Sequence, residues 1–359
     1  MDKEEYDIIR LTRSSGVGHV IFRTMVQLYS SASLAIENFH DFQIKNKLAN
    51  KISLAPTSLL DKELAALEKI GGKIITYKNP NYPIYLRQIY DFPITISYFG
   101  NIELALRQCI AIVGARNCSA NGFRYSYLLA KQATEKGYVV VSGLARGIDT
   151  AAHKASPANT IACLAGGVDY IYPEENKGLY EEIKQEGLII SEMPLGTVPK
   201  PTHFPMRNRI ISGLSEAVIV VEAAINSGSL ITARSALEQN RDVYAVPCFP
   251  GDPRSRGTIK LLKEGAYIME DFDDYKKTEK KITSNVYIEE IVEEDDQELS
   301  IVREDHERII LQQINRSEIS IDEIVAITGL PVNIVLAYIS KLELESVILR
   351  QSNNKVVKI

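Results

Sequence analysis

The chain has 359 residues, of which 45% are hydrophobic and 24% are charged, so it is long enough for two or three globular domains. No apolar run reaches the roughly 18 residues that a membrane-spanning helix needs, and the charged start "MDKEEYDIIRL" lacks the apolar core of a signal peptide. We therefore expect a cytoplasmic protein with no membrane segment. The net charge of −5 does not exclude a polyanionic ligand, because residues 289–298 carry seven acidic side chains and no basic one, and leaving them out changes the balance from −5 to +2.

Residues 1–75 are predicted to form a small helical domain. Apolar residues recur at spacings of three and four along residues 4–39, with an interruption at Gly16 and Gly18. A Gly-x-Gly turn between helices also occurs in helix-hairpin-helix DNA binders, but few lysines surround this one, so we favour a structural turn. A further helix over residues 58–70 ends at a pair of glycines. Three prolines in the next segment indicate that residues 76–105 form an extended connector.

The central part of the chain, residues 76–272 including this connector, is predicted to be one Rossmann-like domain. Six short apolar runs have the length and composition of buried strands: 109–115, 138–143, 160–167, 187–192, 216–222 and 242–247. Helical patterns separate most of these runs. Continuously apolar strands that alternate with helices are typical of a parallel sheet covered on both faces, so the predicted fold class is α/β.

Two further segments follow the predicted sheet domain. Residues 273–303 combine runs of charge with little periodicity and are predicted to be an acidic linker. Residues 304–359 have the pattern of a winged helix, with a helix-turn-helix and then a two-stranded wing whose turn lies near Asn353. The expected recognition helix, residues 332–345, holds one lysine and two glutamates, which favours a protein-interaction or autoregulatory role over duplex binding.

The loops that follow the predicted strands are rich in glycine and serine, and three of them carry arginine. In an open parallel sheet, ligands bind beyond the carboxyl ends of the strands. Glycine lets backbone amides approach a phosphate, while serine and arginine donate hydrogen bonds to it. Several such loops along one sheet edge indicate a polynucleotide, although tight strand-to-helix turns alone also require glycine.

The sequence offers no recognisable catalytic or metal-binding motif. It has no Cys-x-x-Cys or His-Glu-x-x-His sequence, no Gly-x-Ser-x-Gly elbow, no Walker loop and no Gly-x-Gly-x-x-Gly after the first strand. Asp149 and His153 lie four residues apart, but a helix cap and a packed histidine are the simpler interpretations. Glu192 and Glu222 end strands and suit either acid–base chemistry or loop anchoring. We expect no cofactor, no metal and no enzymatic activity.

Several long stretches resemble one known family when they are taken together. "IAIVGAR", "VVSGLARGIDTAAH", "LAGGVDYIYPEEN", "HFPMRNR", "NSGSLIT" and "GDPRSRGT" occur in the order typical of the DNA-processing protein A family, also called DprA or Smf. The resemblance runs nearly continuously from about residue 80 to 270. It implies a helical N-terminal domain of sterile-alpha-motif type and a C-terminal winged helix beside the Rossmann-like domain. It also implies single-stranded DNA binding, protection of incoming DNA in natural transformation, loading of the RecA recombinase and homodimerisation.

The resemblance also implies a DNA-binding pocket, with each position carried over by motif. Its residues are Gly114, Arg116, Ser142, Gly143, Phe204, Arg207, Asn208, Arg209, Ser227, Gly228 and Ser229, with Arg146 and Lys200 as weaker candidates for backbone contacts. Amides, hydroxyls and arginines would hold phosphates, and Phe204 would stack on a base. Arg207 and Arg209 are two residues apart on the expected helix and point to different sides, so which of them touches DNA stays open.

Two other functions remain as alternatives. The first is a nucleotide N-glycosidase of the lysine-decarboxylase-like phosphoribohydrolase type, although the paired glycines of its usual Pro-Gly-Gly-x-Gly-Thr loop are absent from "NSGSLITARSALE". The second is a duplex-specific transcription factor that uses the winged helix.

Overall fold

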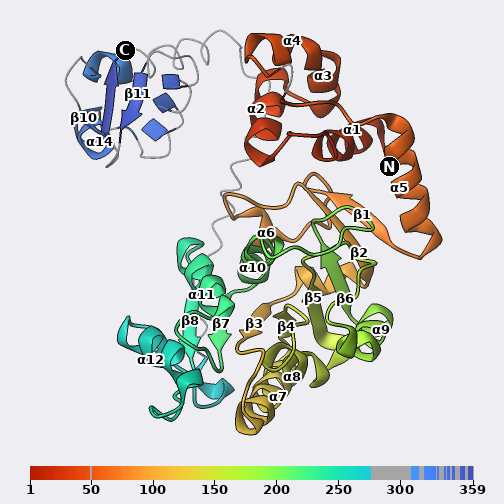
Figure 1. The fold of residues 1–359 in the computed structure, drawn as a ribbon, viewed down its shortest axis with the longest axis vertical. Coiled ribbons are helices and arrows are strands. Elements are labelled where there is room, and N and C mark those ends of the chain that lie inside the picture. The colour runs from red at the N-terminus through yellow and green to blue at the C-terminus, as the bar shows by residue number, and fades with distance from the viewer. Residues whose placement is uncertain are drawn as a thin grey trace. The chain divides into compact units, whose positions relative to one another are not determined.

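The computed structural model describes most of the first 275 residues and parts of the last 51. The described residues are 1–48, 51–275, 309–314, 319–328, 330, 335–336, 338–339, 342–343, 348–351 and 355–358. The chain forms two compact units, Met1–Glu279 and Lys280–Ile359 (Figure 1).

Among the described residues, five helices form the start of the first unit, in agreement with the predicted helical domain. They are α1 (Lys3–Thr12), α2 (His19–Tyr29), α3 (Ala32–Glu37), α4 (Phe39–Lys45) and α5 (Thr57–Lys69). Their apolar faces meet in one cluster around Ile8, Phe22 and Met25. Gly16 has a φ of +74°, and a Cβ atom there would lie 2.1 Å from the Lys51 carbonyl oxygen, so only glycine fits this turn before α2.

The rest of the first unit is built on a nine-stranded sheet in the described part of the chain, in the order β1-β2-β6-β5-β4-β3-β7-β8-β9. The strands are β1 (Lys73–Thr76), β2 (Thr95–Gly100), β3 (Cys109–Val113), β4 (Val139–Ser142), β5 (Thr160–Cys163), β6 (Leu188–Ser191), β7 (Ala217–Val220), β8 (Asp242–Ala245) and β9 (Tyr267–Ile268). All six predicted strands are present, and they pair in parallel. The strand order reverses between β3 and β7, which is where such sheets form a ligand crevice.

Helices cover both faces of this sheet, as the continuously apolar strands predicted. The helices are α6 (Ile84–Arg87), α7 (Ala120–Glu135), α8 (Ile148–Lys154), α9 (Lys177–Glu186), α10 (His203–Leu214), α11 (Gly228–Glu238) and α12 (Arg256–Lys263). Short 3-10 helices are η1 (Ile102–Leu106), η2 (Pro157–Asn159), η3 (Glu174–Asn176), η4 (Pro253–Ser255) and η5 (Phe272–Asp274).

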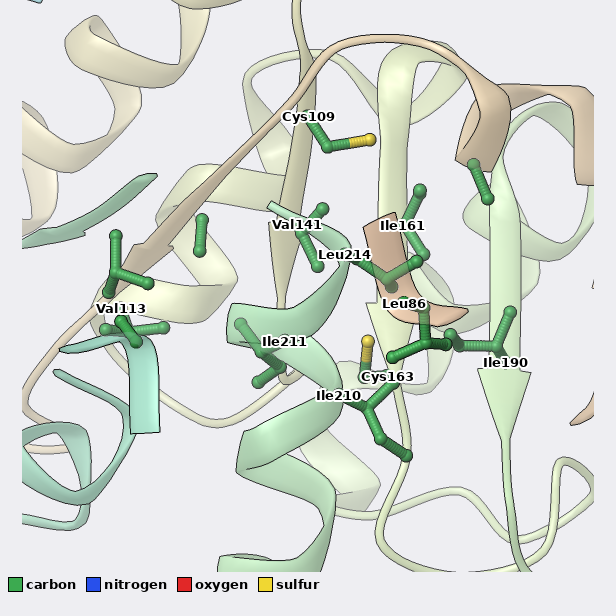
Figure 2. Packing of buried hydrophobic residues seen from close by; sticks show 14 of the residues in the cluster. Leu86, Cys109, Val113, Val141, Ile161, Cys163, Ile190, Ile210, Ile211 and Leu214 are labelled. Carbon is green, nitrogen blue, oxygen red and sulfur yellow. The ribbon is translucent and has the colours of Figure 1, made fainter. Parts of the chain in front are cut away.

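Alternate residues of the central strand β3 face opposite layers. Cys109 and Val113 pack with residues of α6, α10 and α11, whereas Ile110 and Ile112 pack with residues of α7 and α8. Figure 2 shows the first of these layers, in which Ile210, Ile211 and Leu214 of α10 share one cluster with Val141 and Ile161 of the strands. This packing fixes α10 over the sheet and thereby places the start of that helix at the carboxyl edge.

The predicted extended connector, residues 76–105, contains more structure than we expected. It holds α6, β2 and most of η1, and β2 pairs antiparallel with both β1 and β6. Strand β1 starts at Lys73, inside the segment assigned to the helical domain. The two antiparallel strands therefore extend the parallel sheet beyond β6.

The second unit is a small α/β domain with the elements of a winged helix. Strands β10 (Ile319–Ser320), β11 (Ile348–Gln351) and β12 (Lys355–Lys358) form a sheet in the order β10-β12-β11, and helix α14 (Ile321–Thr328) follows β10. Ile314, Ile324 and Val356 lie in its buried cluster. The predicted linker falls mainly outside the described residues, as do the wing turn near Asn353 and much of the expected recognition helix.

Candidate functional site

A pocket of about 310 Å³ lies at the carboxyl edge of the sheet, where the loops after β3, β4 and β5 meet the start of α10. Its lining residues are Arg116, Asn117, Gly143, Ala145, Arg146, Leu164, Ala165, Gly166, Tyr170, Tyr172, Pro173, Pro199, Phe204 and Arg207. Five of the residues predicted from the sequence are therefore brought together here: Arg116, Gly143, Arg146, Phe204 and Arg207. In the part of the chain that the structure describes, the lining combines three arginines with three aromatic rings and contains no carboxylate.

Phe204, in the first turn of α10, is the centre of an aromatic and cationic cluster. The Arg116 guanidinium lies 4.9 Å from the centroid of its ring, and that of Arg207 lies 6.0 Å away. The ring of Tyr172 is 5.8 Å from it and tilted by 60°. Both distances to the arginines lie within the range of cation–π attraction, so positive charge is held beside an aromatic surface.

Arg207 forms the floor of the pocket and is only 6% exposed. Its Nη1 donates to the carbonyl oxygen of Gly143 at 2.6 Å and also to that of Cys163, while its Nε donates to Asn208 Oδ1. The guanidinium thus ties the ends of β4 and β5 to α10. Burial lowers the pKa of Arg207, and the nearby charge of Asp149 opposes that shift.

The residue at position 143 must be glycine for this clamp to form. A Cβ atom on Gly143 would lie 2.5 Å from Arg207 Nη1. Asp149 accepts hydrogen bonds from the backbone amides of Gly143 and Ala145, at 3.1 and 3.4 Å, so its carboxylate shapes the same loop. Burial raises the pKa of Asp149, and Arg207 counteracts this effect. Asp149 therefore stabilises the β4–α8 loop and does not cap the following helix as we had expected.

Arg146 sits on the rim of the pocket and already has an acidic partner. Its Nη2 lies 2.5 Å from Glu175 Oε1, and both side chains are more than half exposed. An exposed pair of this kind contributes about 0–1 kcal/mol and exchanges readily with a competing anion. Arg116 is exposed too, and among the described residues its side chain forms no ion pair.

Glu222, two residues after the end of β7, anchors the loop that carries Arg116. Its carboxylate accepts from the Ser119 amide at 2.8 Å and from the Ser119 hydroxyl at 2.5 Å. Ser119 in turn accepts from the Gly122 amide at the start of α7. Of the two roles that the sequence left open for Glu222, the structure shows loop anchoring.

His153 is a packed residue with both ring nitrogens in hydrogen bonds. Nε2 accepts from the Leu144 amide at 3.3 Å, so Nδ1 carries the proton and donates to Thr160 Oγ1 at 2.7 Å. The Thr160 hydroxyl in turn donates a hydrogen bond to the Val140 carbonyl oxygen at 2.7 Å. Burial lowers the pKa of His153 to about 3, so the ring is neutral.

The remaining predicted residues lie outside the pocket lining. Ser142 is buried and donates to the Ile112 carbonyl oxygen at 2.6 Å. Asn208 donates to the Gly228 carbonyl oxygen at 3.2 Å. Gly114 lies where a Cβ atom would come within 2.6 Å of Ile148. These three residues support the pocket from below.

Ser227, Gly228 and Ser229 form the start of α11, which follows β7 at the same edge of the sheet. The Ser227 hydroxyl caps the helix by accepting from the Ser229 amide, and the two hydroxyls are 2.7 Å apart. Gly228 is exposed. Lys200 is exposed beside the pocket-lining Pro199.

Arg209 is separated from the pocket by its acidic partners. Its Nη2 lies 2.6 Å from both carboxylate oxygens of Glu192, and its Nε lies 3.3 Å from Asp91. Burial raises the pKa of Glu192, and Arg209 opposes that rise. Of the two neighbouring arginines, Arg207 is the one that the structure places in the pocket.

Sequence reasoning missed part of the lining, namely Asn117 and the residues after β5. Tyr170, Tyr172 and Pro173, which follow β5, all line the pocket. Asn176 binds this segment to the β4–α8 loop by donating to the Leu144 carbonyl oxygen at 2.9 Å. Two tyrosines in a loop after a parallel strand are the sequence signal that could have identified this wall.

Two features are absent from the described part of the chain. Within the described ranges, no group of three or more histidine, cysteine, aspartate or glutamate side chains is arranged to hold a metal ion. Among the same residues, none of the helices has the length and apolar character required to span a lipid bilayer.

Three family models that describe domains of the same protein family match this chain. The family model described as DNA recombination-mediator protein A matches residues 73–279, and the DprA winged helix domain matches residues 294–354. A third model, the DprA-like N-terminal HHH domain, matches residues 2–66, so the helical domain is described as a helix-hairpin-helix domain where we had expected a sterile-alpha-motif type.

Individual relatives agree with these models. The DNA processing protein DprA of Bacillus subtilis is 46% identical over 211 residues, which cover 58% of this chain and 71% of the relative. The protein Smf of Synechocystis is 35% identical over 271 residues, which cover 71% of this chain and 67% of the relative.

Two solved structures are also similar. DprA from Streptococcus pneumoniae matches with a TM-score of 0.58 and 36% identity, over 68% of this chain and 80% of that one. DNA processing protein A from Helicobacter pylori, whose description concerns its single-stranded DNA binding mode, matches with a TM-score of 0.53 and 30% identity, over 56% of this chain and 93% of that one. The winged helix and the mostly parallel sheet expected from the sequence are confirmed, and the chain belongs to the DNA recombination-mediator protein A family.

Proposed function

We propose that this protein binds single-stranded DNA in the pocket at the carboxyl edge of the sheet, with little preference for base sequence. The observation that carries the proposal is the lining itself, in which Arg116, Arg146 and Arg207 surround the aromatic surface of Phe204 and Tyr172. Every base has a π-face, so stacking on such a surface tolerates any sequence. The solved relative from Helicobacter pylori, described by its single-stranded DNA binding mode, supports the same ligand.

The residues of the pocket divide into contacts and supports in this proposal. Arg116 and Arg146 contact phosphates, the Gly143 backbone lets the strand approach, and Phe204 stacks on a base. Arg207 adds positive charge from below, while its hydrogen bonds to two carbonyl oxygens hold the floor in place. Lys200 and the start of α11 at Ser227, Gly228 and Ser229 serve as outlying contacts for the DNA backbone. Arg209 does not contact DNA in this proposal, because its guanidinium is paired with Glu192 and Asp91.

The lining favours a binding protein over the N-glycosidase alternative. An enzyme that cleaves the bond between base and sugar needs a carboxylate or another acid–base group beside the substrate. Among the described residues the lining holds no carboxylate, and Glu175, which lies beside the rim, is paired with Arg146. Asp149 is turned towards backbone amides beneath the pocket.

The experiment that tests the proposal compares two arginines at opposite ends of β3. Arg116→Ala removes a charge beside the pocket, while Arg107→Ala removes an exposed charge that precedes the amino end of the same strand. Arg116→Ala should weaken binding of every oligonucleotide tested by a similar factor and reduce the slope of log K against log salt by about 0.7. Arg107→Ala should behave like the parent protein. Equal affinities of the parent and Arg116→Ala for single strands would refute the pocket assignment.

We further propose that the bound strand is protected and passed to the RecA recombinase, and that the protein acts as a homodimer. Membership of a family described as recombination mediators supports this role. Titrating RecA into a mixture of the protein and a nuclease-sensitive single strand tests it. Faster recombinase filament formation in the presence of the protein is expected, and no change relative to naked DNA would contradict it. Light scattering of the free protein would report the mass of the homodimer.

A further inference from the structure

The edge of the sheet that holds the pocket continues past β3 to the ends of β7 and β8, where a second exposed surface lies. Phe249, in the loop after β8, is 79% exposed, and Arg256 at the start of α12 is exposed as well. We propose that this surface is a second subsite for single-stranded DNA, in which Phe249 stacks on a base and Arg256 contacts a phosphate. The inference rests on the proposed function, since it extends the path of the same strand.

A chain of hydrogen bonds connects this surface to the pocket. Glu222 holds the loop of Arg116 through Ser119. The next residue, Ala223, donates its amide to the Arg254 carbonyl oxygen and accepts from the Gly257 amide, both at 2.7 Å. The loops after β3, β7 and β8 therefore form one continuous ledge.

The distance along this ledge suits a short run of nucleotides. Strands β3, β7 and β8 are neighbours in the sheet and all run parallel. Adjacent strands are about 4.8 Å apart, so the carboxyl ends of β3 and β8 are roughly 10 Å apart. An extended strand held at Arg116 reaches Phe249 after a few nucleotides.

Close backbone contacts support the aromatic surface of the ledge. A Cβ atom on Gly257 would lie 2.6 Å from the Ala223 carbonyl oxygen, so the two backbones are in direct contact. A Cβ atom on Gly251 would lie 2.8 Å from the Phe249 ring, which therefore rests against the backbone of its own loop. Because the ring has this support and stays largely exposed, a base can stack on it without displacing a neighbour.

The charge of the ledge favours an anion. Asp252 is occupied by Arg254, with Oδ2 2.6 Å from Nη2, and Glu222 is buried against Ser119. Within the described residues, the Arg256 side chain forms no ion pair. An exposed aromatic ring beside an uncompensated arginine is the combination that sequence-tolerant binders of single strands use. A protein partner would also bury Phe249, and the experiment below separates the two.

The test uses the full chain and oligothymidylates of two lengths, about four and about sixteen bases, at the two ends of the range of known single-strand site sizes. Phe249→Leu keeps an apolar side chain but removes the ring. It should weaken binding of the long oligonucleotide by at least about fivefold and leave the short one, which fits in the pocket, unchanged. Phe249→Tyr restores a ring and should bind both lengths like the parent protein, which also controls for folding.

A matched pair on α12 tests the phosphate contact. Arg256→Gln and Lys263→Gln each remove one exposed positive charge from the two ends of the same helix. Arg256→Gln should weaken binding of the long oligonucleotide and reduce the slope of log K against log salt by about 0.7. Lys263→Gln should change neither the affinity nor the slope.

Three outcomes would overturn the inference. In the first two, Phe249→Leu binds both oligonucleotides as tightly as the parent protein does, or it weakens the binding of both by the same factor. In the third, Phe249→Leu lowers the oligomeric mass and leaves DNA affinity intact, which would assign the ledge to a protein contact. The proposed function fails separately, through parental binding of the short oligonucleotide by Arg116→Ala.

Discussion

At the scale of single residues, burial distinguishes three arginines that look equivalent in the sequence. Arg116 is exposed, Arg207 is 6% exposed and hydrogen-bonded to two carbonyl oxygens, and Arg209 lies against Glu192. The motif that holds Arg207 and Arg209 could be recognised from sequence alone. Sequence alone could not show that Arg207 lies in the pocket and Arg209 outside it, because the position of Arg209 depends on Glu192 and Asp91, which belong to other segments.

The Arg209–Glu192 pair gives the first residue-scale prediction. Arg209→Met leaves the partly buried Glu192 carboxylate without its partner and should lower the free energy of unfolding by about 3 kcal/mol. Adding Glu192→Gln removes that charge, so the double variant should recover much of the loss in denaturant titrations. Its affinity for single-stranded DNA should equal that of the parent protein. A severalfold weaker affinity of the stable double variant would show that Arg209 contacts DNA after all.

His153 gives a prediction about pH. Its pKa is about 3 in the folded protein and near 6.5 when the chain is unfolded, so the unfolded state binds the proton more tightly. Stability is therefore complete above about pH 6.5 and falls by about 1.4 kcal/mol per pH unit as the pH drops towards 3. Between pH 7 and 5, His153 alone should remove about 2 kcal/mol.

The measurement compares unfolding free energies of the parent and of His153→Gln over that range. His19, whose pKa burial lowers to about 4, acts in the same direction in both proteins, so the difference isolates His153. The variant should be less stable at pH 7 and less sensitive to pH. Parallel curves for the two proteins would mean that His153 is not held neutral.

At the scale of elements, the six buried strands of the parallel sheet could be predicted because each is a local apolar run. Strand β2 could not, since three nearby prolines suggested a connector and its partner β6 lies about 90 residues further along the chain. Its pairing is set by the sheet edge that β6 presents and not by local propensity. The same limit applies to the site, where the loops were foreseen but the wall formed by Tyr170 and Tyr172 was not.

Ser142 and Asn208 show that a residue in a family motif need not contact the ligand. Ser142 and Asn208 belong to stretches typical of the family, yet Ser142 is buried and Asn208 is only 8% exposed, and both bind backbone carbonyl oxygens. Their hydrogen bonds satisfy buried polar groups, which favours the same residue types as ligand binding does. Sequence alone does not separate these two reasons.

At the scale of the whole molecule, every pocket residue and the ledge lie in the unit that ends at Glu279. Its final described segment is part of the core. Phe272 is 1% exposed, its ring lies 5.4 Å from that of Tyr138, and the Tyr275 hydroxyl donates to Glu216 at 3.0 Å. A boundary at residue 272 would cut through this aromatic cluster, so the core of the unit extends at least to Tyr275.

A truncation series tests whether this unit is sufficient. A chain ending at Glu279 should keep single-stranded DNA affinity within about twofold of the full protein, a difference below 0.5 kcal/mol, with an unchanged melting temperature. A chain ending at Glu270 loses Phe272 and should be destabilised by about 3–5 kcal/mol, so it serves as the folding control. If the Glu279 chain folds but no longer binds single strands, the winged helix must take part in binding. If only duplex binding is lost, the winged helix reads duplex DNA and the two units recognise different forms of the nucleic acid.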